Sequence, residues 1–174
     1  IKIVGIPLLT HIMRLFKSYG HNEFIIAAGY KKKIIQDYYF KSKEFNNLKV
    51  IDTGKDTMTG GRLLRLKTFF KKNEIFFMTY GDGLSDINLN KLKQFHLKHG
   101  RIASVTAVRP PVRFGEMSIV KSRVSSFKEK PEIKSSWING GFFILNHKIF
   151  DFIKNDSVSF EKQPMEKLST KKNL

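Results

Sequence analysis

Residues 75–83 read Ile-Phe-Phe-Met-Thr-Tyr-Gly-Asp-Gly, an apolar run that ends in an aspartate between two glycines. A short continuous apolar run bounded by turn residues is typical of a strand buried on both faces. Such a strand would deliver Asp82 to the carboxyl edge of a sheet, where glycine allows another backbone or a phosphate to approach closely. This stretch therefore predicts both a buried strand and a candidate site at its end.

The segments on either side of this run alternate between strand and helix patterns. The expected strands are Phe24–Ala28, Leu48–Ile51, Ile75–Thr79, Ile102–Val108 and part of Ile138–Leu145, with a hairpin formed by Met117–Val120 and Val124–Phe127. The expected helices follow Pro7, cover Lys31–Tyr39, begin at Gly60-Gly61, and cover Leu89–Lys98, His147–Phe152 and Phe160–Leu168. This alternation predicts an α/β, Rossmann-like fold with a mainly parallel, mixed sheet and helices on both faces. Ligands bind such sheets beyond the carboxyl ends of the strands, so we expect Gly29, Thr59 and Asp82 along one edge.

The composition is that of a folded globular protein. Of the 174 residues, 41% are hydrophobic, including 16 Phe, which is enough for a sizeable core. The absence of cysteine excludes disulfides and thiolate metal sites and is compatible with a reducing cytoplasm. No apolar run is long enough to span a bilayer, so no membrane partner is expected. Since no repeat or linker interrupts the pattern, we expect a single domain over residues 1–174.

The net charge of +17 allows two interpretations. A nucleic-acid partner would draw Lys and Arg onto one face of the protein. The alternative is a solvated, lysine-rich surface. The basic residues are dispersed along the whole chain and no zinc finger or helix-turn-helix pattern accompanies them, which argues against nucleic acid. Small anionic substrates would also be attracted by such a field.

Four stretches carry residues that suit a binding site. The first is the turn around Asp82, whose carboxylate could hold Mg²⁺ together with phosphate groups. The alternative is a tight turn with a helix-capping aspartate, a common use of Asp and Gly. The second stretch joins Asp52-Thr53-Gly54 to Thr57–Arg62. Paired glycines at a helix start would offer free N–H groups to an anion, and Arg62 adds a fork-shaped donor.

The second stretch lacks the spacing of a Walker A loop or a dinucleotide fingerprint, so a generic glycine-rich loop remains its alternative. In the third stretch, Glu129 could accept hydrogen bonds from sugar hydroxyls and Lys130 could meet a phosphate, unless both belong to a solvated charged turn. The fourth is Asn139-Gly140-Gly141, where either a ligand approaches the backbone or the strand carries a bulge. None of the five histidines pairs with a carboxylate in a metal-binding pattern, and we expect them on helix surfaces or partly in the core.

The order of these motifs closely resembles that of the sugar nucleotidyltransferases over nearly all of the chain. The matching pieces are Gly5–Leu9, Ala28-Gly29-Tyr30, Thr59–Arg62, Tyr80–Gly83, Arg113-Phe114-Gly115, Glu129-Lys130-Pro131 and Asn139–Phe143. Asp52-Thr53-Gly54 leading to Met58–Leu63, together with Ile138–Phe143, resembles the cytidylyltransferase branch.

The resemblance implies a fold of the nucleotide-diphospho-sugar transferase type and a direct displacement. The phosphate of glucose 1-phosphate would attack the α-phosphorus of CTP, releasing pyrophosphate and forming CDP-glucose without a covalent enzyme intermediate. Catalysis would consist of positioning and of charge neutralisation by Mg²⁺ and cationic side chains. The resemblance further implies CTP and glucose 1-phosphate as partners, and a homo-oligomer for the full-length protein.

The resemblance also assigns roles to individual residues. Asp82 matches the metal-binding aspartate and Lys130 the sugar-phosphate lysine, and these two are the expected catalytic groups. The expected substrate-binding residues are Glu129, Lys130, Asn139, Gly140 and Gly141. The expected nucleotide-binding residues are Gly29, Thr59, Gly60, Gly61, Arg62, Tyr80 and Gly81.

Two departures from the family pattern affect what we expect of this chain. The family's opening strand, its glycine-rich loop with an arginine and its Lys-Pro segment do not appear upstream of Ile1, and a second metal-binding aspartate is expected beyond Leu174. In addition, Ile6 stands where family members commonly have lysine. We therefore expect a domain truncated at both termini that could lack activity by itself. The alternatives are a sugar-1-phosphate nucleotidyltransferase that uses UTP, dTTP or GTP, and a non-catalytic binding protein on the same fold.

Overall fold

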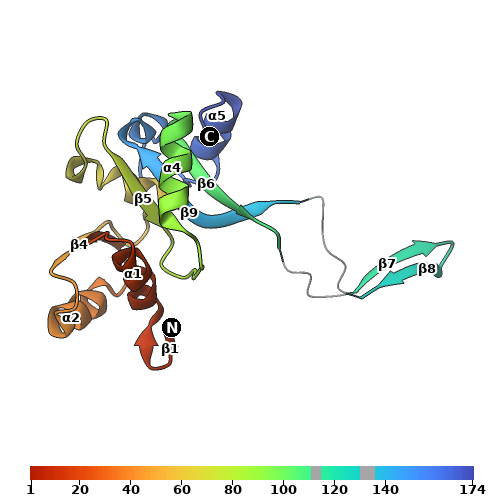
Figure 1. Ribbon diagram of the computed structural model, residues 1–174, viewed down its shortest axis with the longest axis horizontal. Coiled ribbons are helices and arrows are strands. Elements are labelled where there is room, and N and C mark those ends of the chain that lie inside the picture. The colour runs from red at the N-terminus through yellow and green to blue at the C-terminus, as the bar shows by residue number, and fades with distance from the viewer. Residues whose placement is uncertain (111–114, 130–135) are drawn as a thin grey trace. The chain divides into compact units, whose positions relative to one another are not determined.

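The computed structural model describes residues 1–110, 115–129 and 136–174, which form two compact units (Figure 1). The first unit consists of Ile1–Ser104 and Phe142–Leu174, and the second of Val105–Gly141. Two strands, β6 (Ala103–Val108) and β9 (Ile138–Asn146), have residues in both units. The expectation of one domain remains a prediction.

The first unit contains a parallel strand pair joined by a helix. Strand β3 (Glu23–Ala28) pairs with β4 (Asn47–Asp52), in register from Glu23 opposite Asn47 to Ala28 opposite Asp52. Helix α2 (Lys32–Ser42) forms the connection between them. Because the pair is parallel, the loops that follow Ala28 and Asp52 leave the same edge.

A second sheet supplies the apolar centre of the first unit. Its strand order is β5-β9-β6, and β5 (Ile75–Thr79) pairs antiparallel with β9, with Thr79 opposite Phe142. Residues 142–145 of β9 are at most 2% exposed. The fold is thus α/β, as predicted, and among the described strands the parallel pair β3–β4 and the antiparallel pair β5–β9 lie in separate sheets. A short antiparallel ladder of β1 (Lys2–Ile3) and β2 (Ile6–Pro7) was not expected.

Two long helices pack their apolar stripes into this core. Helix α1 (Leu8–Ser18) begins directly after Pro7, as predicted, and α4 (Leu89–His99) ends at Gly100. The shared core consists of Leu8, Ile12, Phe16, Leu89, Leu92, Phe142 and Ile144. No helix in the described part of the chain is both long and apolar enough to cross a membrane.

The remaining helical segments are short, and two of them differ from the prediction. Helix α3 (Thr59–Leu64) starts as expected and is followed by the 3₁₀ turn η1 (Lys67–Phe69). Residues His147–Phe152 are helical, as predicted, but they form a 3₁₀ helix, η2, which the sequence pattern did not distinguish from an α-helix. The last helix, α5 (Gln163–Thr170), starts three residues later than predicted, because the backbone of Phe160 is bound to Thr59 and its ring is buried against Phe143.

The second unit contains the predicted hairpin. Strands β7 (Glu116–Val120) and β8 (Arg123–Lys128) pair antiparallel around a turn in which Lys121 and Ser122 have positive φ. Positive φ at both central residues gives the turn a twist that matches the flanking strands. Five apolar side chains of the hairpin are more than half exposed: Met117, Ile119, Val120, Val124 and Phe127.

Candidate active site

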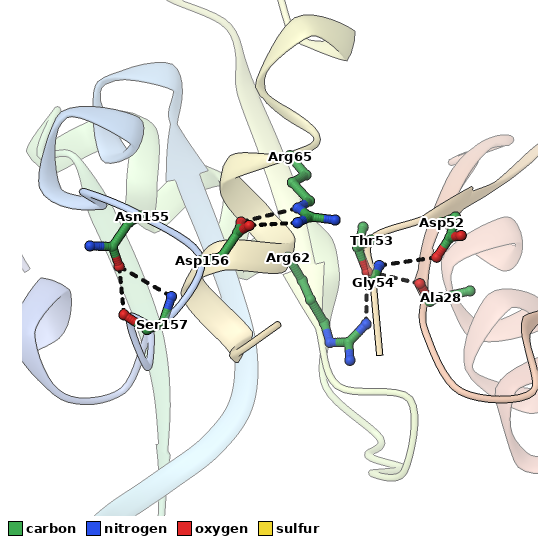
Figure 2. A network of polar contacts seen from close by, with 9 residues as sticks. All are labelled: Ala28, Asp52, Thr53, Gly54, Arg62, Arg65, Asn155, Asp156 and Ser157. Carbon is green, nitrogen blue, oxygen red and sulfur yellow. Dashed lines mark hydrogen bonds and ion pairs between the residues drawn. The ribbon is translucent and has the colours of Figure 1, made fainter. Parts of the chain in front are cut away.

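The loops that follow β3 and β4 are tied together by Thr53 and Arg62 (Figure 2). Thr53 is fully buried, and both its N–H and its hydroxyl donate to the carbonyl of Ala28, at 2.7 and 2.9 Å. From α3, the guanidinium of Arg62 donates to the Thr53 hydroxyl at 2.8 Å and to the carbonyl of Lys55 at 3.2 Å. The fork-shaped donor that the sequence assigned to a phosphate therefore contacts the loop after β4.

The position of Arg62 explains the glycine at position 29. A Cβ atom on Gly29 would lie 2.5 and 2.7 Å from the two terminal nitrogens of Arg62 and 2.7 Å from the carbonyl oxygen of Gly54. Contacts this short do not occur for real side chains, so only glycine fits beside the guanidinium. Gly29 thus has a role in packing, and its contact with a nucleotide remains a prediction.

The expectation of free N–H groups at Gly60 and Gly61 is wrong. Both N–H groups donate to the carbonyl of Val158, at 2.9 and 3.3 Å. A Cβ atom on Gly61 would lie 2.4 Å from the backbone of Asp156, and one on Gly60 would lie 2.7 Å from the carbonyl oxygen of Val158. The paired glycines instead allow a close approach of the protein's own backbone. That Thr59, Gly60 and Gly61 border a nucleotide base stays a prediction.

Glu161 is a polar residue of this region that sequence reasoning missed. One carboxylate oxygen accepts from the hydroxyl of Tyr80 at 2.7 Å, and the other accepts from the hydroxyls of Thr59 at 2.7 Å and Ser159 at 2.8 Å. Two predicted nucleotide-binding residues, Thr59 and Tyr80, therefore meet at one carboxylate. Nothing in the sequence near Glu161 points to either partner, because they lie 102 and 81 residues away.

Glu161 is ionised at neutral pH in this arrangement. Burial raises the pKa of its carboxyl group, but the hydrogen bonds from Thr59, Tyr80 and Ser159 oppose this and hold the pKa below its ordinary value. Its side chain is thus a charged acceptor for three hydroxyl groups.

Asp82 lies two residues beyond Tyr80 and is exposed. The alternative of a helix-capping aspartate is not found, since α4 is capped by Asn88, whose side chain accepts from the N–H of Lys91 at 2.9 Å. Asp82 makes no hydrogen bond or ion pair with the described residues. A Cβ on Gly83 would meet nothing within 4 Å, and one on Gly81 would meet only the end of Leu9, at 4.0 Å. The turn is therefore open to an approaching group.

The surroundings of Asp82 fit a magnesium site of the kind that nucleotides complete. Mg²⁺ is commonly held by one or two carboxylates plus substrate phosphates and water, and not by a cage of protein ligands. Among residues 1–110, 115–129 and 136–174, no group of three or more His, Asp or Glu side chains could hold a metal. An exposed carboxylate at an open turn is compatible with the first arrangement, and the role of Asp82 in holding Mg²⁺ stays a prediction.

The predicted sugar-binding residues belong to the second unit. Glu129 is exposed and lies beside Gly115, where an added Cβ would come 3.0 Å from its carboxylate. Asn139 accepts from the N–H of Gly141 at 2.8 Å, and Gly141 has a φ of +78°. Both expected alternatives for these glycines, a bulge and an approaching ligand, stay predictions. A Cβ on Gly140 would lie 2.8 Å from the Thr106 hydroxyl, which makes glycine necessary there. Lys130 lies outside the described residues, and the sugar site remains a prediction.

The chain was also compared with known proteins. A family model described as nucleotidyl transferase matches residues 1–172. The chain belongs to this family.

Curated relatives of this nucleotidyl transferase include sugar-phosphate enzymes at substantial identity. This chain is 38% identical to glucose-1-phosphate cytidylyltransferase of Salmonella typhi over 196 aligned positions, which cover 100% of this chain and 76% of the relative. It is 35% identical to the probable glucose-1-phosphate cytidylyltransferase of Bacillus subtilis, covering 96% and 74%. The predicted resemblance to the cytidylyltransferase branch is confirmed.

Solved structures agree on the fold of this nucleotidyl transferase. HddC from Yersinia pseudotuberculosis, complexed with GMP-PN, superposes with a TM-score of 0.73 at 25% identity, covering 93% of this chain and 72% of that one. UDP-glucose pyrophosphorylase complexed with UDP-glucose gives a TM-score of 0.68 at 16% identity, covering 100% and 79%, which is informative for the fold alone. The nucleotide-diphospho-sugar transferase fold and the nucleotidyltransferase class are thereby confirmed.

Proposed function

We propose that this nucleotidyltransferase transfers a cytidylyl group from CTP to glucose 1-phosphate, giving CDP-glucose and pyrophosphate. The observation that carries the proposal is the 38% identity to glucose-1-phosphate cytidylyltransferase over the full length of this chain. The geometry adds support, because two predicted nucleotide residues, Thr59 and Tyr80, share Glu161.

In the proposed reaction, a phosphate oxygen of glucose 1-phosphate forms a bond to the α-phosphorus of CTP. The bond from that phosphorus to the oxygen bridging to the β-phosphate breaks, and pyrophosphate leaves with the bond's electron pair. A transfer of this kind needs little covalent chemistry from the protein and depends on positioning and charge stabilisation. The role of the protein's own residues is therefore to hold two anionic substrates in line.

The proposed roles follow the match of these motifs to the family pattern. Thr59 and its neighbours border the base, and Asp82 stands at the open turn where the triphosphate would lie. Asp82 would hold Mg²⁺, which when bound neutralises negative charge on the triphosphate. On the sugar side, Glu129 would accept from sugar hydroxyls, Lys130 would contact the phosphate, and the backbone at Asn139–Gly141 would contact the sugar.

A parallel turnover assay tests the choice of nucleotide. The protein is supplied with glucose 1-phosphate, Mg²⁺ and either CTP, UTP, dTTP or GTP, and pyrophosphate release is followed. We expect CTP to give the highest kcat/KM. A preference for another nucleotide would assign the protein to a different activity of the same family. Binding of glucose 1-phosphate without turnover of any nucleotide would favour the non-catalytic alternative.

We also propose that the full-length protein is a homo-oligomer. The hairpin β7–β8 exposes Met117, Ile119, Val124 and Phe127, and exposed apolar groups of this kind often mark protein interfaces. An isolated two-stranded hairpin is only marginally stable in water, so a partner surface would also stabilise it. Sedimentation velocity measures the oligomeric state, and a monomer at micromolar concentration would contradict this part of the proposal.

A further inference from the structure

We infer that Glu161 is a positioning residue for the nucleotide side of the site, one that fixes the start of α3 against the end of β5. The inference rests on the proposed function, because it gives Glu161 a role in nucleotide binding. Glu161 itself need not touch the nucleotide. It acts through Thr59 on one side and through Tyr80, two residues before Asp82, on the other.

Each carboxylate oxygen of Glu161 binds a different one of the two segments. Oε1 accepts from the Tyr80 hydroxyl at 2.7 Å, while Oε2 accepts from the Thr59 hydroxyl at 2.7 Å. Ser159 provides a second donor to Oε2 at 2.8 Å. Hydrogen bonds to an ionised acceptor are shorter and stronger than neutral ones. One side chain thus joins two segments that otherwise belong to different elements.

The hydroxyl of Thr59 has its direction fixed by a second contact. Its oxygen accepts from the backbone N–H of Phe160 at 2.9 Å. A hydroxyl has one hydrogen to donate, and with the oxygen already accepting, that hydrogen points to Glu161. The atom that faces this hydroxyl must therefore be a hydrogen-bond acceptor. A carboxylate at position 161 supplies one, whereas a lysine or an alanine would not.

Tyr80 is anchored at the other end of its side chain. Its ring packs edge to face with Phe143 at a centroid distance of 5.8 Å, and Phe143 is fully buried. With the ring held by the core and the hydroxyl held by Glu161, the chain at Tyr80 has little freedom. The turn that carries Asp82 departs from this fixed point.

The docking of α3 does not depend on Glu161. The N–H groups of Gly60 and Gly61 bind Val158, and Arg65 forms a bidentate ion pair with Asp156 at 3.0 and 2.5 Å. Removing the Glu161 carboxylate should therefore leave the helix in place and free only Thr59 and Tyr80. This separation is what distinguishes a positioning role from a purely structural one.

Three substitutions of Glu161 test the inference against a matched control. Glu161→Ala removes both contacts, and Glu161→Asp keeps the charge on a side chain one methylene too short to reach both. Glu161→Gln retains one acceptor oxygen for Thr59, and its amide can donate to the Tyr80 oxygen. The control is Glu44→Ala, which removes a carboxylate that binds Arg14 elsewhere in the same unit.

We expect Glu161→Ala and Glu161→Asp to raise the KM for CTP about tenfold, equivalent to about 1.4 kcal/mol. The KM for glucose 1-phosphate should change less than about threefold, because the predicted sugar residues lie on other segments. Glu161→Gln should recover most of the loss, and Glu44→Ala should leave both KM values unchanged. Equal changes in both KM values, or an unchanged KM for CTP in folded Glu161→Ala, would overturn the inference.

A second measurement separates failure of this inference from failure of the proposed function. Amide hydrogen exchange of the protein without substrates should become faster at Thr59 and Tyr80 in Glu161→Ala but not in Glu44→Ala. If the wild type uses another nucleotide, the proposed function fails and the same KM comparison is made with that nucleotide. Unchanged exchange at both segments would show that Glu161 does not fix them, whatever the nucleotide.

Discussion

Two glycine-containing segments of the first unit, the start of helix α3 and the turn around Asp82, have opposite surroundings. At Gly60-Gly61 an added Cβ would collide with backbone atoms of Asp156 or Val158 at 2.4–2.7 Å, whereas at Gly83 it would meet nothing within 4 Å. The space beside Gly60-Gly61 is occupied by the protein's own backbone, whereas the space beside Gly83, in the turn that carries Asp82, is open. Glycine therefore indicates that a close approach is allowed but not which group makes it. The missing side chain of glycine allows close packing at the start of α3 and leaves open space at the turn around Asp82.

The largest effect should follow from removing the charge at the open turn. Asp82→Asn keeps the shape of the side chain, and we expect it to reduce kcat about 100-fold or more, the scale seen when one charge-stabilising group is lost. The fold should be unaffected, because Asp82 is exposed and makes no hydrogen bond or ion pair with the described residues. Turnover at saturating Mg²⁺ measures the effect, and circular dichroism confirms folding.

Asp86→Asn is the matched control for Asp82→Asn, since it neutralises another exposed carboxylate of the same turn. It should retain near-normal turnover. Equal activity of the two variants would mean that Asp82 is only a turn residue and that openness around Gly83 carries no function.

A smaller effect is expected from adding a side chain at the closely packed start of α3. Gly61→Ala places a Cβ against the backbone of Asp156, which cannot move aside as a flexible side chain can, and should lower the free energy of unfolding by about 1–3 kcal/mol. Gly83→Ala should change it by less than about 0.5 kcal/mol, because its Cβ would point into open space. Urea unfolding of both variants gives the comparison. Similar losses would remove the distinction between the two segments.

The smallest effect concerns acid stability. The pKa of Glu161 lies below its ordinary value in the folded protein, so the folded state binds fewer protons at this carboxyl group than the unfolded state does. The resulting stability is fully present above the ordinary pKa of 4.5 and is lost as the pH falls through the lowered pKa of the folded state. Glu161→Gln should therefore show a flatter decline in unfolding free energy on the acid side. An identical decline in the two proteins would contradict the sign of this pKa shift.

The sequence was sufficient where structure depends on neighbouring residues. The strand Ile75–Thr79, helix α1 after Pro7 and the hairpin around Lys121 follow from local apolar periodicity and turn residues, and their predictions are confirmed. The order of short motifs was sufficient for the family, which the matching family model confirms.

Contacts between distant segments could not be predicted in this way. The hydrogen bonds of Gly60 and Gly61 with Val158, and those of Thr59 and Tyr80 with Glu161, join residues that are far apart in the chain. Local patterns contain no information about such partners. Arg62 is a different case, because its guanidinium contacts Thr53 and Lys55, which lie only nine and seven residues away, and its contact with a nucleotide stays a prediction.

The distance along the chain between Thr59 and Glu161 has a consequence for synthesis on the ribosome. Translation proceeds at about 5–20 residues per second, so the 102 residues between them take about 5 to 20 seconds to add. During that time β3, β4 and their connecting helix are complete, but the segment that covers Gly60 and Gly61 has not been made. The segments that carry Thr59 and Gly60 thus acquire these contacts only after Val158 and Glu161 have been added, and a nascent chain stalled before Val158 would lack them.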